Sequence, residues 1–128
     1  METLRTLDSP AVTAPDGCVV HPLLNVATGS AAHCTLAPGG VSHAVRHAVI
    51  QEIWYFIGGQ GELWRRGDAG REEIVACEPG VCATIPEGVE FQFRNTGAEP
   101  LVFLCFTMPP WPGDHVASVV PGKWEPTV

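Results

Sequence analysis

The stretch HAVIQEIWYFIGGQGELW, residues 47–64, places a histidine and a glutamate ahead of a run of apolar residues that ends at a glycine-rich turn. The segment EIWYFI within it has the length and the β-branched and aromatic content of a β-strand. Burying His47 or Glu52 at such a strand costs free energy unless the side chain is paired or bound to a ligand. These two residues are therefore the first candidates for a functional site.

Further segments of strand length recur along the chain, separated by short turns. The chain contains 14 Gly and 12 Pro, so helix breakers leave little room for helices. A charged hairpin tip is expected at residues 65–73, RRGDAGREE, where mixed charges keep the turn solvated. The pattern predicts an all-β fold, mostly antiparallel, of the sandwich or barrel type. The predicted strand segments are AAHCTLA, EIWYFI, GELWRR, EEIVAC, VCATIP, EFQFRN and LVFLCFTM.

Successive side chains of a strand point to opposite faces, so two segments predict which residues point inward. In EIWYFI both faces are apolar apart from Glu52, and we expect both to be largely buried. In EFQFRN one face is apolar, and the other, with Glu90, Gln92 and Arg94, is expected to face water. Such strands close into a barrel whose interior can hold one small ligand. The side chains expected to line this ligand pocket are Trp54, Phe56, Phe91 and Phe93.

Length and composition limit the classes of protein that this chain can represent. With 128 residues it is long enough for one domain with a core. A net charge of −7, with seven Lys and Arg, argues against nucleic acid as a partner. No apolar run approaches the roughly 20 residues of a membrane span, and residues 1–17 lack a secretory signal. The five cysteines form an odd set without a CxxC pair, which favours reduced thiols in a cytoplasmic protein without a membrane partner.

The segment around His47 resembles the first sequence motif of the cupin family, G-x5-H-x-H-x3,4-E-x6-G. Gly39 or Gly40 stands at its opening glycine, and His47 at its second histidine. Glu52 matches the glutamate, and Gly59 the closing glycine. The spacing agrees with the family pattern from His47 onward.

The segment GVCATIPEGVEFQFRN is similar to the second cupin motif, G-x5-P-x-G-x2-H-x3-N. Gly80, Pro86, Gly88 and Asn95 all stand at their family positions. Phe91 replaces the histidine of the motif. The resemblance is therefore close in the turn residues and departs at one potential metal ligand.

The two motifs, at about 39–59 and 80–95, imply that residues 1–128 form a single cupin domain. The fold of that family is a double-stranded β-helix, a jelly-roll barrel whose motif residues line a pocket at one mouth. The segment TMPPWPGDHVASVVPGKW resembles the same part of small cupins described as mannose-6-phosphate-isomerase-like, a label of fold that proves no activity. Small cupins are commonly dimers, so the resemblance also implies a homodimer.

In metal-dependent cupins three histidines and the glutamate bind one divalent cation. By this resemblance His47 and Glu52 are candidate metal ligands, whereas Val45 and Phe91 occupy the two other positions. A site with two protein ligands is weak, because water or substrate must complete the coordination. His43 is a candidate third ligand, since a bulge can swing it toward the missing position. One divalent metal ion of unknown identity and a metal-free pocket therefore both stay open.

Other potential metal ligands have less support. His33, on the preceding segment AAHCTLA, has no motif behind it, and a stray histidine is more often a surface or hydrogen-bonded residue than a ligand. The cysteines are expected to behave as small apolar residues rather than as a zinc site.

The residue pattern supports two functions of different classes. The first is a small-molecule enzyme that performs proton transfer, such as isomerisation, cyclisation or elimination, with His47 and Glu52 as catalytic residues and a metal optional. Partial desolvation of Glu52 beside aromatic residues disfavours its charged form, and His47 can relay the proton. The second is a metal-free binding module that senses or carries a hydrophobic small molecule. A structural alternative makes the two residues a hydrogen-bonded pair without a ligand.

The expected ligand is a hydrophobic or ring-containing small organic molecule. A phosphosugar requires basic residues inside the pocket, and near the motif there is only Arg46, whose side chain is expected to point opposite to His47. We therefore do not expect mannose-6-phosphate isomerase activity. An oxygenase is also disfavoured, because its facial iron site requires two histidines and a carboxylate.

Overall fold

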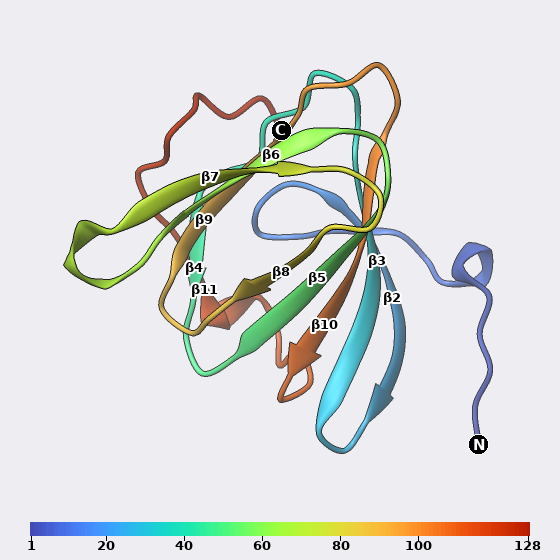
Figure 1. The fold of residues 1–128 in the computed structure, drawn as a ribbon. Coiled ribbons are helices and arrows are strands. Elements are labelled where there is room, and N and C mark those ends of the chain that lie inside the picture. The colour runs from blue at the N-terminus through green and yellow to red at the C-terminus, as the bar shows by residue number, and fades with distance from the viewer.

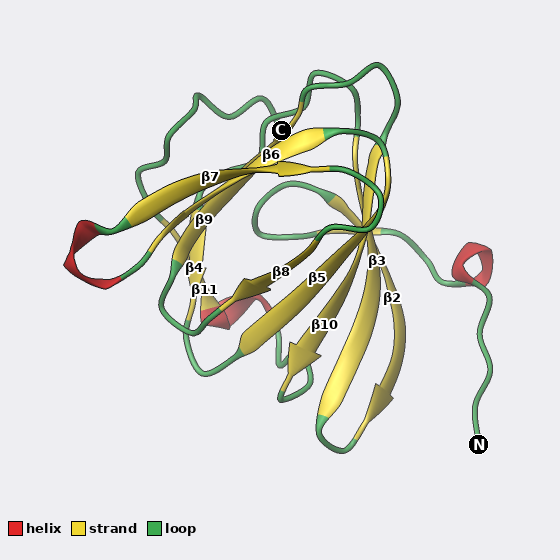
Figure 2. Cartoon of the chain, in the orientation of Figure 1, coloured by secondary structure: helices red, strands yellow, loops and turns green.

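The computed structural model describes residues 1–128, and its regular secondary structure is almost entirely β-strand (Figures 1 and 2). This confirms the all-β prediction, and a strand forms at each of the seven predicted segments. The strands are β1 (Val12–Thr13), β2 (Val19–Val26), β3 (Gly29–Leu36), β4 (Val45–His47), β5 (Gln51–Gly58), β6 (Gly61–Arg66), β7 (Glu72–Cys77), β8 (Cys82–Ile85), β9 (Glu90–Asn95), β10 (Leu101–Met108) and β11 (Ala117–Val119). The short 3₁₀ helices are η1 (Thr6–Asp8), η2 (Asp68–Gly70) and η3 (Asp114–Val116).

The strands form two sheets in the arrangement of a jelly roll (Figure 1). The larger sheet has the order β1-β2-β3-β10-β5-β8, and the smaller has the order β11-β4-β9-β6-β7. All strand pairs are antiparallel. Strands distant in sequence are neighbours, since β10 lies between β3 and β5. The short turn between β4 and β5 carries the chain from one sheet to the other, which sets His47 and Glu52 on facing sheets.

Two motif glycines occupy turns that require them. Gly59 has a φ of +76°, and a Cβ at this position would lie 2.3 Å from the carbonyl oxygen of Pro100, closer than any side chain permits. Gly88 has a φ of +78°, and its N–H donates to the carbonyl of His47 at 2.9 Å. The turn of the second motif thus fixes the backbone at the histidine of the first.

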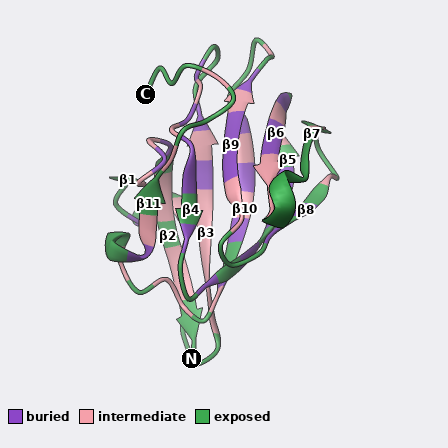
Figure 3. Cartoon of the chain, turned by 90° about the vertical axis from the view of Figure 1, so that its left-hand side faces the viewer, coloured by how far each residue is buried: buried purple, intermediate pink, exposed green.

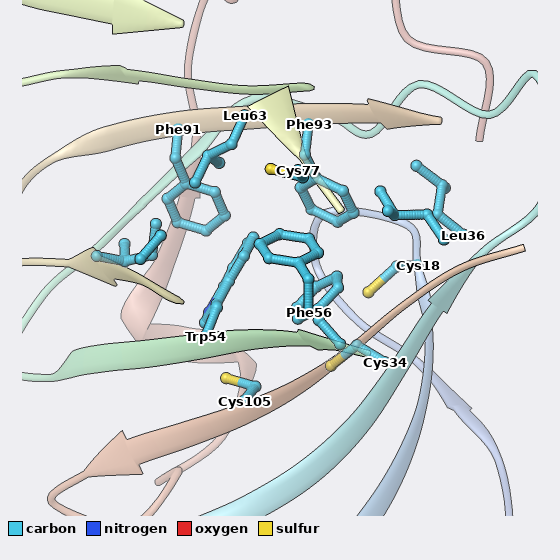
Figure 4. Packing of buried hydrophobic residues seen from close by; sticks show 14 of the residues in the cluster. Cys18, Cys34, Leu36, Trp54, Phe56, Leu63, Cys77, Phe91, Phe93 and Cys105 are labelled. Atoms are coloured by element: carbon cyan, nitrogen blue, oxygen red, sulfur yellow. The ribbon is translucent and has the colours of Figure 1, made fainter. Parts of the chain in front are cut away.

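The core fills the space between the two sheets, where the buried residues gather (Figure 3). Its centre is aromatic, and Figure 4 shows Trp54, Phe56, Phe91 and Phe93 grouped together. The indole of Trp54 stacks on Phe103 at a centroid distance of 4.3 Å and meets Phe91 and Phe93 edge-on, each at 5.2 Å. Edge-to-face and stacked pairs of this kind stabilise a core beyond the area that they bury.

The prediction that both faces of EIWYFI are buried is wrong. Glu52, Trp54 and Phe56 point inward as alternation predicts, and all three are buried. The other face of β5 is exposed, and its apolar side chains keep 39–43% of their surface accessible. The N-terminal segment contacts the larger sheet only at β2, through Ser9, and leaves the outer face of β5 exposed. The exposed side chains on this strand are Ile53, Tyr55 and Ile57.

The face of EFQFRN that was predicted to face water, with Glu90, Gln92 and Arg94, is solvent-exposed only in part. Gln92 is completely buried, because the C-terminal segment crosses over it. Its Oε1 accepts the backbone N–H groups of Lys123 and Trp124 at 2.8 and 2.9 Å. Its Nε2 donates to the carbonyls of Ser42 and Trp124, both at 2.8 Å. The flanking residue Arg94 is partly exposed and pairs with Glu62, as expected for a solvated position.

All five cysteines are free thiols. Four of them, Cys18, Cys34, Cys77 and Cys105, are buried in the core cluster as small apolar residues, and Cys82 is exposed. The structure contains no helix with the length and apolar character needed to cross a membrane.

Candidate functional site

A cavity of about 240 Å³ lies against the inner face of the larger sheet. Its floor is formed by residues of β2, β3, β5 and β10. Two further segments complete its walls: residues 12–18, which begin with β1, and residues 111–114. Most of the wall is apolar. The lining side chains that can contact a ligand through a polar group or an indole ring include Asp16, His47, Glu52, Trp54, Thr107, Trp111 and Asp114.

His47 ends β4, and its ring is 6% exposed. The ring lies edge-on to Phe91 at 5.1 Å and to Trp111 at 5.4 Å. Its Nδ1 atom is buried without a hydrogen-bond partner and lies 3.6 Å from Oε1 of Glu52. Burial lowers the pKa of His47, and the negative charges of Glu52 and Asp16 oppose this shift only in part. The ring is therefore neutral at pH 7, so its contact with Glu52 is a close approach and not an ion pair.

The turn that joins His47 to Glu52 has an unusual backbone. Val49 adopts a φ of 61°, which β-branched residues rarely do because Cβ crowds the backbone. Its N–H donates to Oε1 of Glu87 at 3.1 Å, and the following residue, Ile50, is buried. These contacts hold a strained turn in place, and the turn sets the spacing of the two candidate residues.

Glu52 is 5% exposed and lies on β5 directly opposite Thr107 of β10. Its Oε2 accepts the Thr107 hydroxyl at 2.6 Å, and its Oε1 accepts the Trp54 indole N–H at 3.1 Å. Both oxygens thus act as acceptors, as those of an ionised carboxylate do. Two donors on two strands fix the carboxylate beside the ring of His47.

Asp16 is a second buried acid in the cavity wall, and the sequence did not single it out. It lies in the turn between β1 and β2, is 8% exposed, and accepts the N–H of Cys18 at 3.0 Å. Burial raises the pKa of the Asp16 carboxyl, although the hydrogen bonds from Cys18 lower it in part. No lysine or arginine lines the cavity, so nothing positively charged compensates this group.

The sequence profile of the cupin domain matches residues 32–107. The chain belongs to the cupin family. This confirms the resemblance that the two motifs carry. No curated protein matches the chain by sequence.

Solved structures confirm the cupin fold. Oxalate decarboxylase from Bacillus subtilis superposes with a TM-score of 0.77 at 20% identity, over 91% of this chain and 32% of that chain. The formate complex of oxalate decarboxylase from Lactobacillus farciminis gives 0.73 at 22% identity, over 84% of this chain and 32% of that one. The protein BH2720 from Bacillus halodurans gives 0.65 at 19% identity, over 72% and 70%. This cupin therefore spans about a third of the length of the oxalate decarboxylases.

The residues of this cupin do not fit the metal that some relatives hold. The Bacillus subtilis enzyme has Mn(II) centres. Here Val45 and Phe91, at two of the family's histidine positions, lie opposite each other on β4 and β9 and are buried as apolar core. No group of three or more His, Cys, Asp or Glu side chains in the structure could hold a metal ion. His47 and Glu52 are the two family ligands that this chain retains.

The other predicted site residues lie in different places. Trp54 lines the cavity, whereas Phe56, Phe91 and Phe93 are fully buried in the core and are not among the lining residues. Phe91 nevertheless contacts the ring of His47. Neither His43 nor His33 lines the cavity. The backbone N–H of His43 donates to the carbonyl of Asp16, and the ring of His33 lies beside that of His21 on the outer face of the larger sheet.

Sequence reasoning missed several wall residues for two reasons. Asp16 and Trp111 lie in APDG and MPPWPG, outside the predicted strand segments, where alternation assigns no inward face. Thr107 lies near the end of β10 and points inward by alternation. Its position opposite Glu52 becomes visible only once the pairing of β10 with β5 is known. Once a barrel is recognised, polar residues in the turns near its mouth are candidates for the wall of the ligand cavity.

Proposed function

We propose that this cupin is an enzyme that catalyses a proton transfer in a small organic molecule, such as an isomerisation, cyclisation or elimination. The observation that supports this best is the environment of His47. Its Nδ1 atom is buried and unpaired, 3.6 Å from Glu52, at the wall of a largely apolar cavity. An unpaired buried nitrogen costs free energy, and proteins retain such a cost mainly at functional sites.

His47 has the properties of a general base. Because burial lowers its pKa, the ring is neutral at pH 7 and can accept a proton. Glu52, held by Trp54 and Thr107, lies beside the ring and stabilises the imidazolium that forms. The proton then returns from His47 to a different atom of the substrate or to a leaving group. These steps use only the side chains of this chain.

The size of the cavity supports a substrate with a single ring. An apolar protein cavity of about 150 Å³ binds benzene. The cavity of this cupin, at about 240 Å³, therefore accommodates one ring with a short substituent. Oxalate, the substrate named for the structural relatives, is a poor candidate, because a dianion would face Asp16, Glu52 and Asp114 without a basic residue.

The test is solvent deuterium incorporation into single-ring carbon acids, with phenylacetone as the first probe, followed by NMR. Wild-type protein is expected to accelerate exchange at the carbon next to the carbonyl. His47→Gln and Glu52→Gln should each lower this rate by about 100-fold or more, the range of general acid–base catalysis.

Two matched variants serve as controls. His43→Gln makes the same substitution at a histidine outside the cavity, and Glu73→Gln makes the same change at an exposed acid of β7. Both should exchange at the wild-type rate. Equal rates in all five proteins, with unchanged circular dichroism, would remove His47 and Glu52 from catalysis.

A metal-free binding module is the second candidate, and a specific observation favours it. Val45 and Phe91 fill two positions of the family's metal ligands with apolar side chains, while the cavity beside them is retained. A protein of this kind binds a ring-containing molecule without converting it. Saturable binding of a probe by wild type and by His47→Gln alike, without deuterium incorporation in either, would support this candidate over the enzyme.

We also propose that two copies of this cupin associate through the outer face of the larger sheet. Ile53, Tyr55 and Ile57 of β5, together with Phe106 of β10, are exposed there. Ile53 lies directly opposite Phe106 in the sheet, so these side chains form one apolar surface rather than scattered residues. Light scattering should give the mass of a dimer for wild type and of a monomer for Tyr55→Lys.

A further inference from the structure

The cavity that holds His47 carries acidic groups and no basic ones. Asp16 and Glu52 line it and are each more than nine-tenths buried, and Asp114 lies exposed at its edge. No lysine or arginine is among the lining residues. Buried carboxylates are normally paired with a cation or a metal ion, and neither partner is provided here by the protein.

We propose that this cavity selects ligands that carry a protonated amine on a small apolar or single-ring body. This inference shares with the proposed function only the assumption that the same cavity binds the ligand, and it adds the chemical class of that ligand. An ammonium group donates hydrogen bonds to carboxylates and accepts none. It therefore supplies what Asp16 and Glu52 lack, whereas an anion would add a charge that nothing balances.

The environment of each carboxylate leaves room for such a donor. Asp16 accepts one backbone N–H, from Cys18, through Oδ1. Each oxygen of Glu52 accepts one hydrogen bond, from Trp54 or Thr107, and a carboxylate oxygen can accept a second. The other side chains of the wall that contact these carboxylates are the thiols of Cys18 and Cys105, which are weak donors.

The pKa of Asp16 agrees with an acid that has no cation beside it. Desolvation is the largest cause of its upward shift, and the negative charge of Glu52 adds to it. An ammonium group beside the carboxyl would oppose both effects, because an opposite charge favours the ionised form. The cost of burying Asp16 is thereby reduced when the ligand is bound.

The aromatic wall suits the same ligand. Trp111 and Trp54 line the cavity together with the acidic groups, and most of the remaining wall is apolar. The indole of Trp111 can attract a cation through its negative face, whereas Trp54 is stacked on Phe103 and contributes apolar surface. The net charge of −7 adds a long-range attraction for cations and a repulsion for anions.

Three probes with one ring and different charge test the proposal. Benzylammonium, benzyl alcohol and benzoate share the same aromatic body, and their affinities can be measured by calorimetry at pH 8 and low salt. Benzylammonium should bind about 30-fold more tightly than benzyl alcohol, the size expected when a buried charge gains its partner. Benzoate should bind most weakly.

Variants locate the effect in the cavity. Asp16→Asn should lower the affinity for benzylammonium by about 30-fold and leave that for benzyl alcohol unchanged. Asp114→Asn, at an exposed position, should lower it by a smaller factor without a risk to folding. Asp68→Asn removes the same charge from the distal hairpin tip and should have no effect.

Several results would overturn the proposal. The first is that benzyl alcohol or benzoate binds as tightly as benzylammonium. The second is that no probe binds at millimolar concentration, and the third is that both cavity variants retain the selectivity of the wild type. These outcomes are distinct from failure of the proposed catalysis. Amine-selective binding without deuterium exchange would contradict the proposed catalysis and support the ligand class. Exchange of phenylacetone without amine selectivity would support the catalysis and contradict the ligand class.

Discussion

The interior of the barrel has two halves that meet at Trp54 and Phe103, which both line the cavity. On one side of these residues the space is closed, and Phe56 and Phe93 pack against Phe103 at centroid distances of 5.1 and 5.4 Å. On the other side the cavity opens, and the inward position next to Trp54 on β5 is the acid Glu52. The same strand, with the same alternation, thus contributes to a packed core and to a polar site.

The two halves differ in how burial is compensated. In the closed half, burial of apolar surface is itself favourable and needs no partner. In the open half, the burial of three polar groups is offset unevenly. Both oxygens of Glu52 accept hydrogen bonds, Asp16 accepts one from the backbone of Cys18, and Nδ1 of His47 has no partner. Proteins retain unfavourable burial of this kind where it serves function. The closed half is therefore expected to provide most of the stability, and the open half holds the residues of the proposed chemistry.

The largest expected effect concerns stability of the closed half. Phe93→Ala removes a completely buried ring that contacts Trp54 and Phe103. It should lower the free energy of unfolding by about 3–5 kcal/mol, as large truncations in a packed core do. Urea unfolding followed by tryptophan fluorescence measures this. A loss no larger than that of a surface substitution would show that the closed half is not the source of stability.

Metal binding can be introduced at the boundary between the halves. Phe91→His, combined with Val45→His, restores the two histidine positions of the family next to His47 and Glu52. Affinity for Ni²⁺ or Zn²⁺ should rise by at least the factor of about 10–100 that even a supporting residue contributes. Calorimetry with the folded double variant checks this. No gain would mean that the side chains at positions 45 and 91 do not point toward His47 and Glu52.

The open half should make stability depend on pH through His47. Burial lowers its pKa below the ordinary value of 6.5, so between the lowered value and 6.5 the unfolded chain binds a proton that the folded chain does not. Stability is therefore complete above pH 6.5 and decreases as pH falls below it, by about 1.4 kcal/mol per pH unit at most. Melting temperatures of wild type and His47→Phe should diverge in this range. Parallel curves would contradict the assignment of a buried neutral ring.

Asp16 should produce the opposite slope at lower pH. Burial raises its pKa above 3.8, so the folded chain retains a proton that the unfolded chain has released. Its contribution to stability is complete below pH 3.8 and is lost as pH rises through the raised value. Asp16→Asn should flatten this part of the curve and leave the protein slightly more stable than wild type at pH 7. A destabilised variant would indicate that the carboxylate has a cationic partner within the protein.

Local patterns predicted the fold and part of the site. Alternation in EIWYFI correctly assigned Glu52 and Trp54 to the inward face, since neighbouring residues of a strand must point in opposite directions. The glycine spacing of both motifs correctly indicated turns, as at Gly59, where any Cβ would meet the backbone of Pro100. Alternation could not separate Trp54, which lines the cavity, from Phe56, which fills the core, because both are inward on one strand.

The sequence by itself therefore determined the all-β architecture, the cupin family and the candidate pair of His47 and Glu52, because these depend on spacings within short segments. Tertiary structure decided what surrounds that pair. Asp16 and Trp111 come from turns almost a hundred residues apart, and they reach one cavity only when both sheets have closed around it. Tertiary packing also determines which strand residues are buried. Gln92 is buried by the C-terminal segment, whereas Tyr55 stays exposed because nothing in this chain lies over it. Contacts of this kind depend on how distant segments pack, and no local pattern encodes them.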